Sequence, residues 1–263
     1  EAETGKHFNL TLTTNTILLD EEKLAFLNRE NIQLILSIDG RREVHDRMRP
    51  FADGVGSYDM VLAKMHRAVD SRQGQNYFAR GTYTANNTDF AADVLDLADQ
   101  GFLRLSVEPV VGKGEPYELT EAHLPELYRQ YDLLAAEYLR RKAAGCGFEF
   151  FHFNVDLQNG PCLVKRLSGC GAGHEYFAVT PDGDLYPCHQ FVGRDGFKVG
   201  NVFDGIERRE ICREFREAHV LTKEECRSCW ARFYCSGGCH ANAHAYNGTI
   251  HIPYQMGCAL QKK

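Results

Sequence analysis

Four cysteines in the last third of the chain have the spacing of a metal site. They lie within fourteen residues in the arrangement C-x2-C-x5-C-x3-C, formed by Cys226, Cys229, Cys235 and Cys239. Thiolates at such short intervals can converge on iron or zinc, because the intervening residues turn the chain tightly. Two consecutive glycines before the last cysteine give the backbone the freedom to wrap a cofactor closely. This stretch therefore predicts a metal site.

Further cysteines indicate more than one metal centre. Cys170, Gly183 and Cys188 follow the pattern C-x12-G-x4-C, and eighteen residues separate Cys239 from Cys258. Seven thiols exceed the needs of one tetrahedral ion, whereas two four-iron clusters, or a pair of zinc ions, would use about eight ligands. Spacing alone leaves iron-sulfur clusters and structural zinc both open.

A disulfide framework is the less favoured explanation of the cysteines. The chain begins Glu-Ala-Glu-Thr-Gly-Lys-His and shows no secretory segment. Ten cysteines in 263 residues of an α/β pattern also do not resemble a small disulfide-stapled domain. We therefore expect reduced thiols and a cytoplasmic location.

Composition narrows the classes of partner. A formal charge of −6 and the lack of a basic stripe argue against nucleic-acid binding. No run of about 18 apolar residues exists, which argues against a membrane span. With 43% hydrophobic residues the chain has ample material for a packed core. A small molecule or a peptide is the expected partner.

The elements that must position these residues follow a strand-helix order in the first half of the chain. Strands are expected at 8–13, 32–38, 77–84 and 103–109, and helices at 20–28, from 57 onward, at 88–99 and at 120–144. The nearly continuous apolar run at 32–38 is typical of a strand buried on both faces. Strands and helices that alternate at short intervals predict a parallel sheet with right-handed crossovers.

The composition of the sequence changes after the helix expected at 120–144, and Gly145 is expected to end that helix. Beyond it, cysteine, glycine and aromatic residues concentrate while regular periodicity fades. We therefore expect two domains, residues 1–145 and 146–263. In the second, Asp182-Gly183 between two short apolar runs predicts a β-hairpin, which would bring Cys188 back towards Cys170.

These residues resemble the radical S-adenosylmethionine (radical SAM) enzymes that carry a C-terminal SPASM domain. The pattern of that domain is C-x9-15-G-x4-C, C-x2-C-x5-C-x3-C and a last cysteine, and residues 170–258 meet every interval. Upstream, Thr14-Asn15, Ser37-Ile-Asp39-Gly40 and the stretch 43–50 look like strand ends of the family's barrel. The resemblance implies an α/β fold: a partial (β/α)6 barrel, of which later strand-helix units are present, followed by a cysteine-rich iron-sulfur domain.

A narrower resemblance points to the maturases of six-cysteine (SCIFF) peptides. It is carried by Gly160-Pro-Cys162, by Cys170-Gly-Ala-Gly173 and by residues 184–193. It implies thioether formation between a cysteine sulfur and a carbon of another residue, in a ribosomally made cysteine-rich precursor peptide. Sulfatase maturation and carbon-carbon crosslinking are the alternatives within the enzyme class. A non-catalytic zinc-binding interaction domain is the alternative of another class.

One departure from the family pattern bears on activity. Neither the C-x3-C-x2-C motif that holds the S-adenosylmethionine-cleaving cluster nor a Gly-Gly-Glu stretch occurs in these residues. We therefore expect a fragment that lacks the first two strand-helix units and is inactive on its own. S-adenosylmethionine and a third 4Fe-4S cluster would belong to the intact enzyme.

The resemblance also implies a ligand set for two auxiliary 4Fe-4S clusters. The outer cluster would be held by Cys226, Cys229, Cys235 and Cys258, and the inner cluster by Cys170, Cys188 and Cys239. The fourth iron of the inner cluster would bind Cys162 or stay open for the substrate sulfur, unless Cys162 is an inert buried thiol. Cys146 and Cys212 fit no interval and are expected to be structural.

Several positions match the family's S-adenosylmethionine site, at one strand end and on the strands that follow it. They are Ser37, Asp39, Arg80 and the backbone near Glu108 and Pro109, with Asn15 as a weaker candidate. Ser37 equally suits an ordinary strand-end hydroxyl, and Arg80 a salt-bridge partner.

His189 directly follows Cys188, where related sulfatase-maturing enzymes have a catalytic acid. A histidine at this position would transfer a proton, or it would form a hydrogen bond near the cluster.

Overall fold

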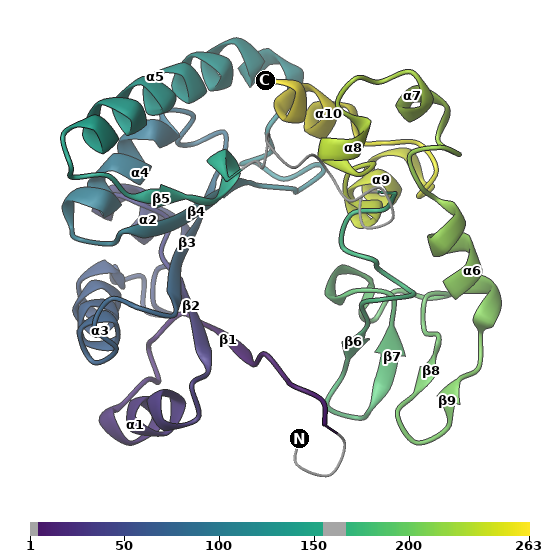
Figure 1. Ribbon diagram of the computed structural model, residues 1–263, viewed down its shortest axis with the longest axis horizontal. Coiled ribbons are helices and arrows are strands. Elements are labelled where there is room, and N and C mark those ends of the chain that lie inside the picture. The colour runs from purple at the N-terminus through teal and green to yellow at the C-terminus, as the bar shows by residue number, and fades with distance from the viewer. Residues whose placement is uncertain (1–4, 155–166) are drawn as a thin grey trace. The chain divides into compact units, whose positions relative to one another are not determined.

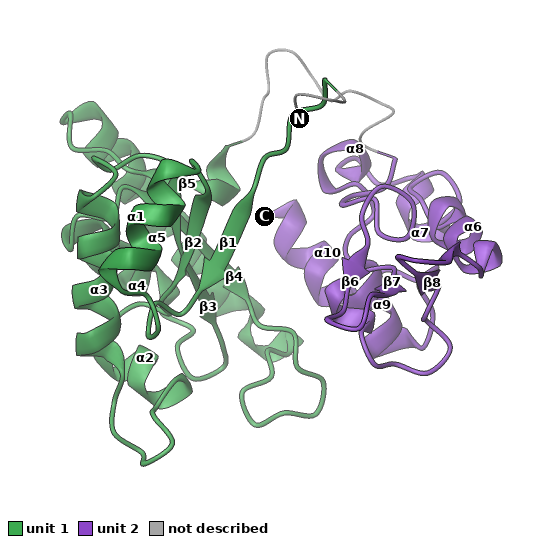
Figure 2. Ribbon diagram, turned by 90° about the horizontal axis from the view of Figure 1, so that it is seen from below, with its two compact units in different colours: residues 1–155 green, residues 156–263 purple. Residues whose placement is uncertain are grey.

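The computed structural model describes residues 5–154 and 167–263 and divides the chain into two compact units, residues 1–155 and 156–263 (Figure 2). The first unit contains a five-stranded sheet in the order β1-β2-β3-β4-β5, in which each neighbouring pair is parallel. Its strands are β1 (Thr11–Thr14), β2 (Gln33–Ser37), β3 (Tyr77–Tyr83), β4 (Arg104–Pro109) and β5 (Glu149–Phe150). The predicted parallel α/β arrangement is confirmed.

Helices connect the strands of this unit and cover one face of its sheet (Figure 1). They are α1 (Glu21–Arg29), α2 (Arg42–Met48), α3 (Tyr58–Asp70), α4 (Phe90–Asp99) and α5 (Leu124–Ala143). The Asp20 side chain caps α1 by accepting a hydrogen bond from the Lys23 N–H at 2.9 Å. All the predicted helices of this half are present, whereas the short α2 was not predicted.

The core of the first unit lies between the sheet and these helices. Leu34, Leu36 and Ala79 on the strands are fully buried, as are Met65 and Val94 on the helices. Along β2 and β3 every second residue is buried, and the residues between them are partly or fully exposed. The expectation that residues 32–38 are buried on both faces is therefore wrong, because the helices of this unit cover one face alone.

The boundary between the units follows β5 rather than the long helix. Glu149 and Phe150 pair with Arg104 and Leu105 of β4. The chain therefore stays in the first unit beyond Gly145, and the units divide between residues 155 and 156.

The second unit contains a small antiparallel sheet in the order β6-β7-β8-β9. Its strands are β6 (Ala178–Val179), β7 (Asp184–Tyr186), β8 (Gly200–Asn201) and β9 (Gly205–Ile206). The predicted hairpin is β6-β7, where Gly183 has a φ of +84° and donates its N–H to the Thr180 carbonyl at 2.9 Å.

Short helices follow the sheet of the second unit. They are α6 (Arg209–Glu217), α7 (Glu224–Arg227), α8 (Arg232–Cys235), α9 (His240–Asn247) and α10 (Gln255–Lys262). Phe191, Val199, Phe215, Ala241 and Ile250 form the centre of a separate hydrophobic core. Helices and strands this short contain too few residues to show a hydrophobic periodicity, so the sequence predicted few of them.

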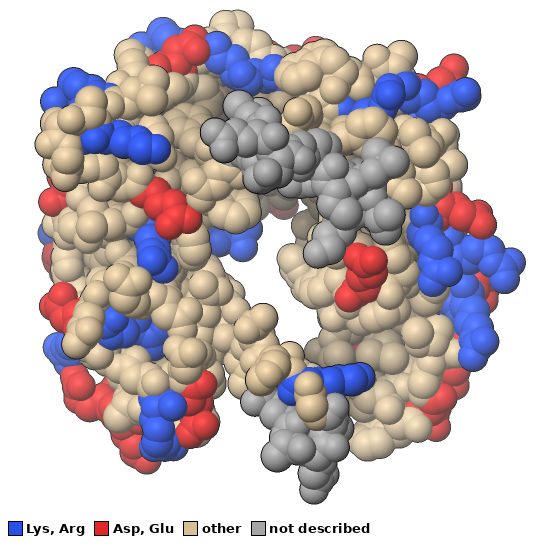
Figure 3. All heavy atoms as spheres, viewed as in Figure 1, with Lys and Arg blue, Asp and Glu red and all other residues tan. Residues whose placement is uncertain are grey.

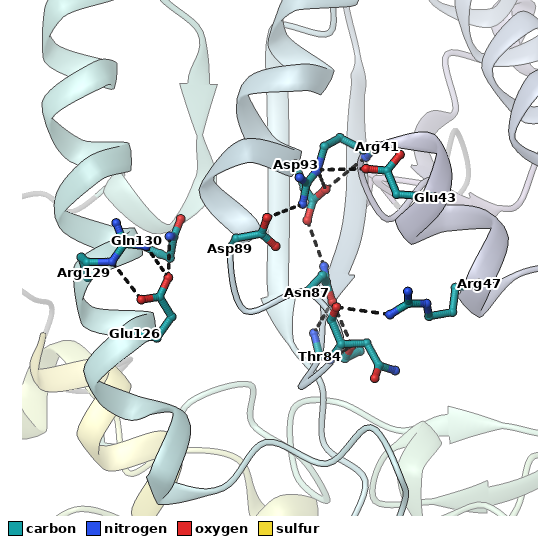
Figure 4. A network of polar contacts seen from close by, with 11 residues as sticks. Arg41, Glu43, Arg47, Thr84, Asn87, Asp89, Asp93, Glu126, Arg129 and Gln130 are labelled. Atoms are coloured by element: carbon teal, nitrogen blue, oxygen red, sulfur yellow. Dashed lines mark hydrogen bonds and ion pairs between the residues drawn. The ribbon is translucent and has the colours of Figure 1, made fainter.

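A buried polar network fixes the loop after β2 against α4 (Figure 4). Asp93 of α4 accepts hydrogen bonds from Arg41 Nε at 2.7 Å and from Asn87 Nδ2 at 3.0 Å. Burial raises the pKa of Asp93, although the hydrogen bonds from Arg41 and Asn87 act in the opposite direction. The network leaves no room at Gly40, because a Cβ there would lie 2.3 Å from the Asp93 Cβ.

The surface carries both signs of charge. On the face shown in Figure 3, acidic and basic side chains are interspersed over both units. Among residues 5–154 and 167–263, no helix has both the length and the apolar character that a membrane span requires.

Candidate iron-sulfur centres and strand-end site

Four of the predicted ligands line one cavity in the second unit. Cys226, Cys229, Cys235 and Cys258 border this cavity, which also touches Ala231, Gly237 and Pro253. Cys226 lies on α7, Cys235 ends α8 and Cys258 lies on α10. The structure thus brings together the four cysteines expected to hold the outer cluster, although Cys258 is far from the others in sequence. We call these residues the outer cysteine set.

Tight backbone turns produce this convergence. The Cys229 N–H donates to the Cys226 carbonyl at 3.1 Å, and α8 begins just beyond it. Ser236, Gly237 and Gly238 then have φ values of +58°, +84° and +73°, so the chain turns back sharply after Cys235. Positive φ costs glycine little, which explains the two glycines in the motif.

Three more cysteines come together around the predicted hairpin. Burial raises the pKa of the Cys188 thiol, and the neighbouring Cys239 and Cys170 add to the rise; burial also raises the pKa of Cys239, with Cys170 acting in the same direction. The backbone supports this inner cysteine set, since Cys188 follows β7 and Cys239 directly precedes α9. The Gln190 side-chain amide also donates to the Cys239 sulfur at 3.9 Å. Cys162, the expected fourth ligand, lies outside the described residues.

The surroundings of the thiols suit soft metal ligation. Burial raises the pKa of Cys188, Cys226, Cys235 and Cys239, and it raises that of Cys258 to about 11. Metal binding must therefore displace protons from these thiols. A thiolate-lined cavity with glycine backbone at its wall fits an iron-sulfur cluster by its donor set. No three His, Cys, Asp or Glu side chains in the described part of the chain are placed to hold a single metal ion.

A buried lysine lies among these sulfurs. Lys223 is 2% exposed, and its Nζ donates to the Gly237 carbonyl at 3.0 Å. Burial lowers the pKa of Lys223, while the charges of cysteines from both sets act to raise it. Lys223 carries no signal in the sequence, because only the tertiary structure shows that it is buried.

The remaining cysteines are separate from the two sets. Cys146 is exposed, and its Sγ lies 3.6 Å from the Arg141 carbonyl. Cys212 of α6 is partly buried and packs against the core of the second unit. None of the nine described cysteines forms a disulfide.

In the first unit, Ser37 at the end of β2 is a neighbour of Arg80 in the middle of β3. They are paired in the parallel register of β2 and β3, and Arg80 is paired with Ser106 of β4. Paired residues in a parallel sheet point to the same face, so these three side chains share one face. It is the face opposite the buried residues of β3. The structure therefore brings together two of the residues expected at the S-adenosylmethionine site.

Asp39 has its side chain occupied by protein groups. Its carboxylate accepts from Arg49 Nε at 2.6 Å, from Arg49 Nη2 at 3.0 Å and from the Thr82 N–H at 3.0 Å. The Asp39 N–H in turn donates to Nδ1 of the buried His45 at 3.3 Å. Asp39 thus stabilises the strand-end loop, which leaves Ser37 and the backbone as the groups nearest to a ligand role there.

Glu108 has partners that the sequence analysis missed. It accepts from His152 Nε2 at 2.9 Å and from Ser106 Oγ at 2.9 Å. Burial acts to raise the pKa of Glu108, but the His152 interaction and the Ser106 hydrogen bond hold it below its ordinary value. His152 lies in a Phe-His-Phe turn after β5, and no sequence pattern links it to β4.

The other two candidates make local contacts. Asn15 is exposed, and its side chain accepts from the Ile17 N–H at 3.2 Å. His189 is exposed as well, and its Nδ1 lies 3.1 Å from the Tyr176 hydroxyl. Neither contact excludes a functional role, and both roles stay predictions.

A parallel sheet with helices on one face, joined to a unit with two cysteine sets, defines an α/β protein with an iron-sulfur domain. Residues 170–230 match the model of the SPASM family, described as an iron-sulfur cluster-binding domain. A solved structure of native anSMEcpe with bound AdoMet and Cp18Cys peptide superimposes with a TM-score of 0.75 at 19% identity, covering 95% of this chain and 72% of that one. This likeness shows the fold: a parallel α/β unit followed by a cysteine-rich unit, in which residues 170–230 match the SPASM model.

Curated relatives extend the similarity along the chain. A cysteine-type anaerobic sulfatase-maturating enzyme of Clostridium novyi is 22% identical over 91% of this chain and 66% of its own length. The mycofactocin maturase MftC of Mycolicibacterium smegmatis is 27% identical over 90% of this chain and 60% of its own length. The chain thus spans 60 to 66% of the length of the first curated relatives it matches.

Proposed function

We propose that the whole protein is a radical SAM oxidoreductase that modifies a peptide by forming a thioether crosslink. The observation that carries the proposal is the convergence of the outer cysteine set on one cavity. The spacing of these cysteines is that of the SPASM pattern, and the relatives named above are maturases. The peptide would be a ribosomally made, cysteine-rich precursor, modified in the cytoplasm.

The two cysteine sets would hold two auxiliary 4Fe-4S clusters. Four thiolates complete the outer cluster, whereas the inner set provides three described thiolates. Its fourth position would take Cys162 or bind the substrate sulfur, which iron would keep deprotonated and positioned. When bound, the clusters would supply thiophilic iron and a one-electron acceptor.

Formation of a thioether crosslink requires an electron acceptor and a base. Bonding a carbon radical to a thiolate sulfur releases one electron, and the thiol must first lose a proton to a base. His189, next to Cys188, is our candidate for that proton transfer. Ser37 and Arg80, paired on one face of the sheet, would bind S-adenosylmethionine together with the backbone near Glu108.

We propose that the apolar edge at β1 is a contact surface. Leu10 and Leu12 at this edge are 56% and 39% exposed. Leu12, Leu18 and Phe26 line a groove of about 480 Å³ between β1 and α1. An apolar surface of this kind is typical of a contact surface.

Sulfatase-type maturation is the second candidate, favoured by the similarity to the Clostridium novyi enzyme. The test is mass spectrometry of a cysteine-containing peptide incubated with the whole protein, S-adenosylmethionine and a reductant. Thioether formation lowers the peptide mass by two hydrogen atoms and retains sulfur, whereas oxidation of cysteine to formylglycine removes the sulfur. A peptide unchanged by a protein that cleaves S-adenosylmethionine would contradict both.

Metal analysis separates the enzyme from the zinc-binding alternative. A brown protein that contains iron and acid-labile sulfide after anaerobic reconstitution supports the redox enzyme. A colourless protein with zinc and no sulfide would identify a structural or binding module instead.

A further inference from the structure

Lys223 is a buried cation without a carboxylate partner. It directly precedes α7, is 2% exposed and forms no salt bridge with an Asp or Glu side chain within residues 5–154 and 167–263. Lysine is rarely buried unless its charge is compensated, because removing an ammonium group from water is costly. The protein must therefore provide negative charge of another kind.

The Lys223 ammonium group lies at the wall of the outer cavity. Its hydrogen-bond acceptor Gly237 borders that cavity together with Cys226, Cys235 and Cys258, and Cys239 of the inner set follows Gly237 two residues later. A single cation thus lies within the electrostatic reach of both sets. Metal-bound thiolates of these cysteines would supply the negative charge that Lys223 lacks.

The lysine is held in place by the motif itself. Its Nζ donates to the carbonyl of Gly237, which lies between Cys235 and Cys239. Gly237 has a φ of +84°, and a Cβ at this residue would lie 3.4 Å from Val220 Cγ1 and 3.8 Å from the Lys223 Nζ. The turn that carries the ligands therefore also positions the cation.

We propose that Lys223 is the counter-charge of the two iron-sulfur clusters and raises their reduction potentials. The inference rests on the proposed function, because it requires clusters at both cysteine sets. A thiolate-ligated 4Fe-4S cluster is anionic, and reduction adds one more negative charge. A fixed positive charge nearby in a medium of low dielectric constant stabilises the reduced form more than the oxidised form. Lys223 would thus help the clusters accept the electron that thioether formation releases.

The test is a redox titration of the cluster-loaded protein, followed by electron paramagnetic resonance. Lys223→Met removes the charge and the hydrogen bond, while Lys223→Gln removes the charge but keeps a donor for the Gly237 carbonyl. We expect both variants to lower the ratio of reduced to oxidised cluster at least tenfold at a fixed potential, which is about 59 mV for a one-electron couple. Lys262→Met is the matched control, because Lys262 borders the outer cavity but is exposed and screened by water.

Stability measurements distinguish this role from a structural one. Without metal, Lys223→Met replaces an uncompensated buried charge with an apolar chain of similar length, so the urea midpoint should stay the same or rise. With clusters bound, the same variant should lose iron faster than the wild type. A fall in stability of the metal-free protein would indicate a structural lysine and overturn the inference.

The remaining outcomes are equally decisive. Wild-type potentials in Lys223→Met, or in Lys223→Gln alone, would overturn the role of the charge while leaving the proposed function intact. A wild-type protein that binds no iron and sulfide on reconstitution would overturn both the inference and the proposed function.

Discussion

Arg49 donates two hydrogen bonds to the Asp39 carboxylate, from Nε to Oδ2 at 2.6 Å and from Nη2 to Oδ1 at 3.0 Å. The Asp39 side chain is 4% exposed and the Arg49 side chain is 37% exposed, so the pair joins a buried carboxylate to a partly exposed guanidinium group. The pair closes the loop that follows Ser37, where the strand ends meet. A residue expected to bind a cofactor thus serves first to hold the cofactor loop in place.

Removing Arg49 should destabilise the first unit. Arg49→Met leaves a buried carboxylate with the Thr82 N–H as its described donor, and we expect a loss of about 2 kcal/mol in the free energy of unfolding, after allowance for solvent screening of Arg49. Urea unfolding followed by circular dichroism measures it. Arg42→Met, which removes the exposed ion pair with Asp59, is the control and should change nothing measurable. Equal midpoints for the two variants would contradict the role of the pair.

His45 should make the first unit sensitive to acid. Its Nδ1 accepts from the Asp39 N–H and its Nε2 lies 3.0 Å from Ser57 Oγ, so the buried ring is neutral. Burial lowers the pKa of His45 in the folded state. The unfolded chain then binds the extra proton first, and stability present above pH of about 6.5 is lost as the pH falls through the folded-state pKa.

The check is urea unfolding between neutral and mildly acidic pH for the wild type and for His45→Phe. The variant is expected to be less stable at neutral pH, because two hydrogen bonds are lost, but to have the shallower pH dependence. Parallel pH profiles would show that another group causes the acid sensitivity.

Gly40 and Gly54 offer a matched pair of glycines with positive φ, at +121° and +85°. A Cβ at Gly40 would collide with the Asp93 side chain, whereas one at Gly54 would meet nothing within 4 Å. We expect Gly54→Ala to cost about 1 kcal/mol from backbone strain alone. Gly40→Ala should cost more than about 2 kcal/mol, since it also displaces the buried network. Thermal unfolding of both variants measures the difference, and a Gly40→Ala variant as stable as Gly54→Ala would refute the steric argument.

Cysteine replacements should separate the two predicted clusters. The wild type should bind about eight iron atoms per chain after anaerobic reconstitution, with acid-labile sulfide in similar amount, if both sets hold 4Fe-4S clusters. Cys226→Ala and Cys188→Ala should each remove close to half of the iron. Cys212→Ala is the control, because Cys212 belongs to neither set, and it should keep all of it. Complete loss of iron in either of the first two variants would mean that the sets do not bind independently.

His189 is the subject of a further prediction on the whole protein. His189→Ala should slow peptide modification by about 10²-fold or more if the ring transfers the substrate proton. His189→Ala should leave the iron content unchanged, because the described contact of the ring is with the Tyr176 hydroxyl. Tyr176→Phe tests that contact and should have the smaller effect. Full activity in His189→Ala would leave His189 as a hydrogen-bonding residue only.

Local patterns were sufficient for much of the architecture. The strands at β1 to β4 and the helices α1, α3, α4 and α5 follow from apolar periodicity, from an N-cap at Asp20 and from a stop at Gly145. The β6-β7 hairpin follows from Asp182-Gly183, because positive φ at that glycine is a local requirement. The short intervals between Cys226, Cys229 and Cys235 need no long-range contact to converge, whereas the assignment of Cys239 to the inner set and of Cys258 to the outer set is implied by the resemblance alone.

Long-range packing decided the rest. The sequence by itself determined the strand-helix order, the hairpin and which cysteines could share a metal. Only the tertiary structure decided that Cys258 reaches the outer cavity, that Asp39 is paired with Arg49, and that His152 meets Glu108. It alone showed that Lys223 is buried among sulfurs. The physical reason is that burial and charge pairing depend on segments distant in sequence, which no local period or spacing encodes.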